Sequence, residues 1–115
     1  MLVRHRSSHD ARLSEVRAQA TDANWSTATQ AHLQSELAKR GAQVASVDCR
    51  STACVATLEW SSRAQAQAEY RHLIEPDGEL PCDRQIFLDR AEREDVPYRA
   101  TLVVDCAHVR AHPSL

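Results

Sequence analysis

Residues 10–40 have the composition and spacing of helix, but their apolar positions fall on two nearly opposite faces. The segment therefore either breaks near residues 21–24, where Asp22 or Asn24 would cap a second helix, or uses its two faces for two partners. We predict the break, and we expect Gly41 to end the second helix. The first face carries Leu13, Val16 and Ala20, and the second carries Trp25, Thr29, Leu33 and Leu37.

The pattern after Gly41 predicts two hairpins with a further helix between them. Alternation of apolar and polar residues predicts strands over residues 43–49 and 54–60 and over the segments "CDRQIFLDR" and "YRATLVVDC", the last two joined by the charged "AEREDVP". Residues 61–75 predict a helix capped by Ser61 or Ser62, and "PDGELP" after it is a turn signal. The inner face of that helix would carry Ala66, Tyr70, Leu73 and Ile74.

This order of elements predicts the fold class. We expect an α+β fold in which an N-terminal helix or helix pair is followed by a β-hairpin, a helix and a second β-hairpin, with a four-stranded antiparallel sheet and helices on one face. The chain of 115 residues is long enough for one domain with a modest core. We expect that domain over residues 10–107, a mobile N-terminal segment over 1–9 and a C-terminal tail over 108–115.

The register of the first hairpin predicts a disulfide between Cys49 and Cys54. Opposed residues in an antiparallel hairpin have a constant sum of residue numbers, so joining these cysteines fixes the other pairs. The disulfide and the apolar side chains then share one face, and the polar side chains fall on the other. The resulting pairs are Val47 with Ala56, Ala45 with Leu58, and Gln43 with Trp60.

The second hairpin predicts a disulfide between Cys82 and Cys106 by the same argument. This register centres the turn on Glu94 and brings Asp83 opposite Asp105, a like-charge pair that a nearby Arg or a small offset would have to relieve. On the cysteine face it pairs Ile86 with Leu102 and Leu88 with Ala100, with Val104 beside them, and on the other face it pairs Asp89 with Arg99.

Other uses of the cysteines fit the spacing less well. A thiol redox site usually has C-x-x-C at the start of a helix, whereas here the spacing is C-x-x-x-x-C in a hairpin. A zinc site usually takes ligand pairs two to four residues apart, and Cys82 and Cys106 are far apart in sequence. His108 and His112 could share a helix face, but they follow a strand and precede Pro113, so we interpret them as tail residues. We therefore expect no metal and no organic cofactor, and we identify no catalytic residue.

Composition bears on the compartment and on the partners. The core must be built from small residues, because 18 alanines stand against one Phe, two Trp and two Tyr, and disulfides would therefore contribute much of the stability. The net charge of −2 is spread along the chain and argues against nucleic acid as a partner. No apolar run is long enough to enter a membrane as a spanning helix. Four cysteines favour a periplasmic or secreted protein whose signal or anchor has been removed over a cytosolic one.

The segment "VDCRSTACVATLEW", preceded by a Trp-containing helix and followed by a Ser-led, Ala-rich helix, resembles a family of uncharacterised secreted or membrane-anchored proteins of proteobacteria, especially myxobacteria and xanthomonads. The motif of that family is a C-R-[ST]-x-x-C hairpin, matched here by Cys49, Arg50, Ser51 and Cys54. The resemblance covers residues 22–75. It implies an extracytoplasmic location and a hairpin disulfide, and it implies no activity.

The sheet face opposite the cysteines suggests the function. It should carry four apolar side chains among polar ones, which is unusual for a fully solvated face, and it would favour association unless a partner, a second copy or the N-terminal helix covers it. These partner-binding candidates are Val44, Val55, Phe87 and Val103. We expect a non-catalytic interaction module that binds a protein partner or a second copy of itself. The alternative is a small enzyme or ligand-binding protein with a pocket between helices and sheet near Trp25, Trp60 and Tyr70.

Overall fold

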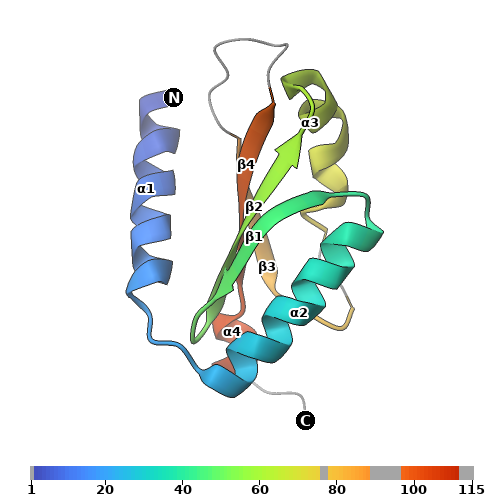
Figure 1. Cartoon of the computed structure of the whole chain (residues 1–115). Coiled ribbons are helices and arrows are strands. Elements are labelled where there is room, and N and C mark those ends of the chain that lie inside the picture. The colour runs from blue at the N-terminus through green and yellow to red at the C-terminus, as the bar shows by residue number, and fades with distance from the viewer. Residues whose placement is uncertain (1, 76–77, 89–96, 112–115) are drawn as a thin grey trace.

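The computed structural model describes residues 2–75, 78–88 and 97–111, with side chains from residue 10 onward. It has three layers, with a helix on one side of a sheet and the other helices on the opposite side (Figure 1). The helices are α1 (Leu2–Ala18), α2 (Ala23–Lys39), α3 (Arg63–Glu69), a 3-10 turn η1 (Tyr70–His72) and α4 (Ala107–Ala111). The strands are β1 (Gln43–Cys49), β2 (Ala53–Trp60), β3 (Asp83–Leu88) and β4 (Tyr98–Asp105).

The predicted fold class and element order are confirmed. The four strands form one antiparallel sheet in the order β1-β2-β4-β3, so each hairpin supplies one central and one edge strand. The helices α2 and α3 contribute side chains to the core on the disulfide face, as expected, and α4 joins them from the segment expected to be a tail. The helix α1 lies over the opposite face. The first helix begins earlier than the sequence indicated, at Leu2. A further helix, α4, forms in the segment expected to be a tail.

The predicted break between the first two helices is also confirmed. The Asp22 carboxylate caps α2 by accepting a hydrogen bond from the Trp25 N–H at 3.4 Å. At the other end of α2, Gly41 takes φ +89°, a left-handed conformation that glycine adopts without steric cost. Ser62, rather than Ser61, caps α3 through the Gln65 N–H.

The strand register follows the prediction except at one position. In the second hairpin Ile86 opposes Leu102 and Leu88 opposes Ala100, as predicted. In the first hairpin Val47 opposes Ala56, but a β-bulge at Ala45 shifts the rest of the pairing. Val44 therefore opposes Leu58, and Gln43 opposes Glu59, so the predicted Ala45–Leu58 and Gln43–Trp60 pairs are wrong. A bulge adds one residue to one strand, so the side chains beyond it from the hairpin turn, here Val44 and Gln43, point to the faces opposite to those predicted.

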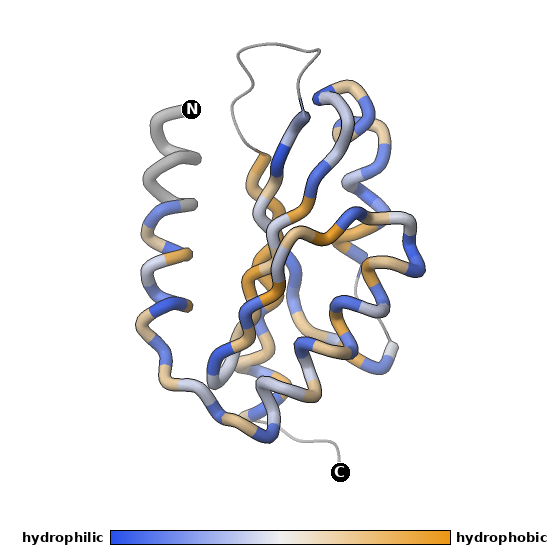
Figure 2. The backbone as a smooth tube through the Cα atoms, viewed as in Figure 1, coloured by the Kyte–Doolittle hydropathy of each residue, from blue (hydrophilic) through white to orange (hydrophobic). Residues whose placement is uncertain are grey.

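Apolar residues concentrate along the strands (Figure 2) and form two separate cores. The main core lies on the disulfide face and joins the sheet to α2, α3 and α4. The second core is small and lies under α1. It consists of Val16, Ala53, Val55 and Val103, with Leu13 and Phe87 packed against them.

Candidate functional site

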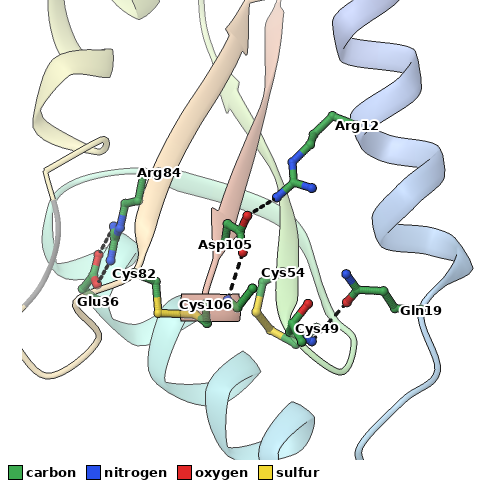
Figure 3. Close-up of a disulfide and its surroundings, with 11 residues drawn as sticks. Arg12, Gln19, Glu36, Cys49, Cys54, Cys82, Arg84, Asp105 and Cys106 are labelled. Carbon is green, nitrogen blue, oxygen red and sulfur yellow. Dashed lines mark hydrogen bonds and ion pairs between the residues drawn. A yellow bond between two sulfur atoms is a disulfide. The ribbon is translucent and has the colours of Figure 1, made fainter. Parts of the chain in front are cut away.

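The four cysteines form the two predicted disulfides, Cys49–Cys54 and Cys82–Cys106. Both lie at the same end of the sheet, next to each other (Figure 3). Each cysteine is at most 1% exposed, and all four belong to the main core. The disulfides therefore tie together the strand ends at one edge of the main core.

The turn between Cys49 and Cys54 is held by segments from both sides of the sheet. Ser26 Oγ of α2 donates a hydrogen bond to the Arg50 carbonyl at 3.0 Å. The Thr52 N–H donates to Gln19 Oε1, in the segment between α1 and α2, at 3.0 Å, and the Thr52 carbonyl accepts from the Cys106 N–H at 2.8 Å. The residues of the C-R-[ST]-x-x-C motif thus organise the meeting point of both helices, the first hairpin and the end of β4.

Three of the four partner-binding candidates lie together under α1. Val55 is 8% exposed, Val103 is 1% exposed, and Phe87 is partly buried beside them. With Ala53 these residues form what we call the apolar strip, on the α1 face of the sheet. The face is therefore covered by the N-terminal helix rather than open, as one of the alternatives in the sequence analysis allowed.

The fourth candidate, Val44, lies on the other face. It is partly buried and packs against the main core, because the bulge at Ala45 reverses its direction relative to strict alternation. The prediction that Val44 shares a face with Val55, Phe87 and Val103 is wrong for this reason.

The cover that the described side chains of α1, residues 10–18, provide is thin. Among its described side chains, residues 10–18, only Val16 is buried, and Arg12 and Leu13 are partly buried. Arg12 Nη2 donates to Asp105 Oδ2 at 2.6 Å and also pairs with Glu15 within α1 at 3.0 Å. One ion pair to β4, one buried valine and one half-buried leucine are thus the main described contacts of α1 with the sheet.

The contact between Arg12 and Asp105 resolves the like-charge pair that the register predicted. Asp83 and Asp105 do face each other, and the Arg12 guanidinium from α1 compensates the Asp105 charge. The predicted Asp89–Arg99 pair lies outside the described residues, because Asp89 is not among them. Among the described residues, Arg99 pairs with Glu59 of the neighbouring strand at 2.7 Å.

A buried ion pair on the disulfide face was not predicted. The Arg84 side chain is 0% exposed, and its two terminal nitrogens donate to the two carboxylate oxygens of Glu36, which is 9% exposed (Figure 3). Arg84 Nη1 also donates to the Leu73 carbonyl at 3.1 Å, and Arg40 Nε lies 3.5 Å from Glu36 Oε2. Strict alternation along the strand places Arg84 on the inward face, between Cys82 and Ile86. This position was the signal in the sequence that could have predicted a buried charge.

The aromatic residues proposed for a pocket are part of the main core. Trp60 is 5% exposed, and Trp25 and Tyr70 pack at the edge of the same core. The Arg110 guanidinium of α4 stacks over the Trp25 ring at 4.5 Å and also binds Asp22 at 2.8 Å. These contacts join α4 to the start of α2 and give the aromatic rings a packing role.

Two hollows of about 310 Å³ each lie among the described residues, and the three aromatic residues line neither of them. Ligand sites commonly have about 300–1,000 Å³ and mostly apolar walls, whereas these are lined mainly by polar and charged side chains. The first lies at the end of α2 and is lined by His32, Ser35, Glu36, Lys39, Arg40 and Glu79. The second lies between α1 and the outer strand β3 and is lined by Arg12, Asp83, Arg84, Gln85, Val103 and Asp105.

The described part of the chain brings no three His, Cys, Asp or Glu side chains together as a metal-binding group. His108 lies on α4, where the sequence analysis expected a tail, and His112 lies outside the described residues. His32 lies 3.7 Å from Glu79 through its Nδ1.

Comparison with protein-family models, with curated proteins and with solved structures finds no match for this chain. Among the described residues, no helix has the length and apolar character needed to cross a membrane.

Proposed function

We propose that this chain is an extracytoplasmic, disulfide-stabilised interaction module without catalytic activity, and that its binding surface is the α1 face of the sheet. The observation that carries the proposal is the apolar strip of Ala53, Val55, Phe87 and Val103 under a helix with one buried side chain among those described. A surface of this kind is apolar enough to bind a partner and covered lightly enough to release its own helix.

The strength of the cover can be compared with that of the main core. Burial of one valine contributes about 1.5–3 kcal/mol, from which the cost of ordering the α1 side chains must be subtracted. A helix of 17 residues is only marginally stable in water without tertiary packing. The ion pair between Arg12 and Asp105 adds little, because both side chains are partly exposed at 22% and 38%. The contacts of the described part of α1 therefore require far less free energy to break than the main core requires to open.

The compartment is proposed on the basis of the disulfides. Two buried disulfides in one small domain are typical of periplasmic and secreted proteins and rare in the reducing cytosol. The resemblance of the Cys49–Cys54 hairpin to secreted or anchored proteobacterial proteins supports the same location. Mass spectrometry of the processed N-terminus of the native protein would test it.

The binding surface is tested by Phe87→Asp, with Leu88→Asp as the matched control. Phe87 packs at the edge of the apolar strip, whereas the neighbouring Leu88 is 39% exposed and points to the other face. We expect Phe87→Asp to keep the disulfides and the main core but to weaken association at least about tenfold, since a charge in an interface core is poorly tolerated. Leu88→Asp should leave association unchanged.

Association would be measured by sedimentation velocity of the purified protein and by co-purification from its native host. Near-ultraviolet circular dichroism would establish that each variant keeps its core. If Phe87→Asp and wild type associate equally, or if both variants weaken association to the same extent, the apolar strip is not the binding surface.

A further inference from the structure

The segment between α1 and α2 has no intrinsic helix breaker. Residues 19–22 are Gln, Ala, Thr and Asp, without Gly or Pro, and the helices on both sides are rich in helix-forming residues. What holds the break is the local cap by Asp22 together with tertiary contacts of Asp22 and Gln19. Asp22 caps α2 and binds Arg110 at 2.8 Å, and Gln19 Oε1 accepts a hydrogen bond from the Thr52 N–H at 3.0 Å.

The same stretch of chain therefore has a second arrangement available, a single helix over residues 2–39. In the closed form α1 and α2 lie on opposite sides of the sheet, and the linker carries the chain around the end with the two disulfides (Figure 1). Straightening the linker would take α1 off its own sheet and expose the apolar strip. An exposed apolar strip and a projecting helix that fits it would then be present in one molecule.

We infer that the partner of the α1 face is a second copy of this chain, and that two copies exchange their α1 helices across continuous α1–α2 helices. This inference rests on the proposed function, since it names the occupant of the same surface. The chemistry of the strip matches α1 itself. Val16 and Leu13 fill the apolar strip, and the Arg12 guanidinium meets the carboxylate of Asp105, which otherwise faces Asp83.

Exchange repeats these contacts between copies and adds helix at the linker. The balance between the closed and the exchanged form therefore depends on protein concentration and on the stability of the break, because the contacts to the sheet cancel between these two forms. They do not cancel against an open monomer whose α1 is released, so a change that prevents α1 from docking, such as Phe87→Asp, still weakens association. Variants in the linker should shift the equilibrium in opposite directions without touching the apolar strip.

Asp22→Ala removes the cap that stabilises the break but leaves a good helix former for the continuous form. Loss of a cap shifts the equilibrium from the broken to the continuous helix about fivefold for each chain. For a dimer of two chains this lowers the dissociation constant about 25-fold. We expect this variant to dimerise at least that much more tightly than wild type in sedimentation equilibrium.

Ala23→Pro is the matched control. Ala23 is the first residue of α2, where proline is well tolerated, and Asp22 before it already has the extended conformation that proline requires, with φ −96° and ψ 100°. In a continuous helix the same proline would be interior and would disfavour exchange by at least about 100-fold per chain. This variant should remain monomeric at concentrations at which Asp22→Ala is dimeric.

A charge-reversal mixture identifies the helix that is exchanged. Arg12→Asp in one chain and Asp105→Arg in a second chain each break the contact between α1 and β4 within one molecule. In an exchanged heterodimer, each α1 meets a complementary charge on the other chain, so mixing should give heterodimers in preference to either homodimer. Native mass spectrometry of one isotope-labelled and one unlabelled chain would measure the fraction.

The outcomes separate the exchange from the proposed function. Equal association of Asp22→Ala and Ala23→Pro, together with a statistical or absent heterodimer in the mixture, overturns the exchange. If Phe87→Asp still weakens association in that case, the surface stands and its occupant is a different molecule or a differently docked copy. If Phe87→Asp has no effect either, both proposals fail.

Discussion

Replacing Glu36 by Leu removes both carboxylate oxygens that Arg84 binds and leaves its guanidinium, 0% exposed, with the Leu73 carbonyl at 3.1 Å as its described acceptor. An ionised group buried without its partner destabilises a protein by about 3–5 kcal/mol. Because the Arg84 side chain is 0% exposed, we expect Glu36→Leu to lower the free energy of unfolding by about 4 kcal/mol.

Arg84→Met should be less severe. The Glu36 carboxylate that remains is 9% exposed, and Arg40 Nε lies 3.5 Å away, so part of its charge stays compensated. In addition, Arg84 Nε is buried and has no hydrogen-bond acceptor among the described residues, an unfavourable arrangement that the methionine removes. We expect a loss of about 3 kcal/mol for this variant.

The double variant should recover most of that stability. Glu36→Leu with Arg84→Met replaces the pair by apolar side chains of similar size, and such replacements of buried pairs are often close to neutral. The Leu73 carbonyl loses one donor, which leaves a net loss of about 1 kcal/mol. The coupling energy between the two positions is then about 6 kcal/mol.

Urea unfolding under non-reducing conditions, followed by tryptophan fluorescence and circular dichroism, would measure all four proteins. Arg99→Met is the control, because its partner Glu59 belongs to a surface pair in which Arg99 is 62% exposed, and it should change stability by less than about 1 kcal/mol. If the loss in the double variant equals the sum of the two single losses, about 7 kcal/mol, the two side chains act independently and the reasoning is refuted. If Glu36→Leu does not fold even without urea, recovery of a folded state in the double variant still shows that the two positions are coupled.

Two further predictions concern the disulfides and α1. Cys82→Ala with Cys106→Ala should lower the free energy of unfolding by about 3.5 kcal/mol, and Cys49→Ala with Cys54→Ala by about 2 kcal/mol, because the bonds span sequence separations of 24 and 5. Urea unfolding of each double variant would measure these losses. Equal losses for the two disulfides would contradict loop closure as the source of their stabilising effect. Backbone amides of α1 should exchange with deuterium faster than those of β4, and Val16→Ala should lower α1 protection a further tenfold or so without affecting β4. Equal protection of α1 and β4 in wild type would contradict the thin cover.

The sequence predicted the sheet well because two independent constraints agreed. The register that joins each cysteine pair is also the register that places apolar side chains on one face, and few other registers satisfy both. The bulge at Ala45 escaped prediction because alanine fits either side of a strand, so a shift at this residue leaves the hydrophobic pattern of "QVASV" equally plausible. As a result, Val44 was predicted on the wrong face of the sheet.

The long-range contacts could not be read from local pattern. Alternation placed Arg84 inward, but its partner lies on α2, 48 positions away in the sequence, and no local rule connects the two positions. The ion pair between Arg12 and Asp105 is similar, because the register predicted the need for an arginine near Asp105 but not which of the arginines would supply it. The place of α1 was open for the same reason, since its few apolar residues fit a helix over the sheet as well as a helix for a partner.

The distribution of stabilising contacts over the two faces explains why α1 can leave without unfolding the protein. Both disulfides, the buried Glu36–Arg84 pair and the main core lie on or tie into the disulfide face, where they connect α2, α3 and α4 to all four strands. None of these contacts involves the described side chains of α1, residues 10–18. Release of α1 therefore costs the second core and its few polar contacts, and the sheet that remains keeps its register because the disulfides fix both hairpins. A rigid sheet with a removable helix has the two properties that exchange between copies requires, namely an unchanged docking surface and a segment that can move from one molecule to another.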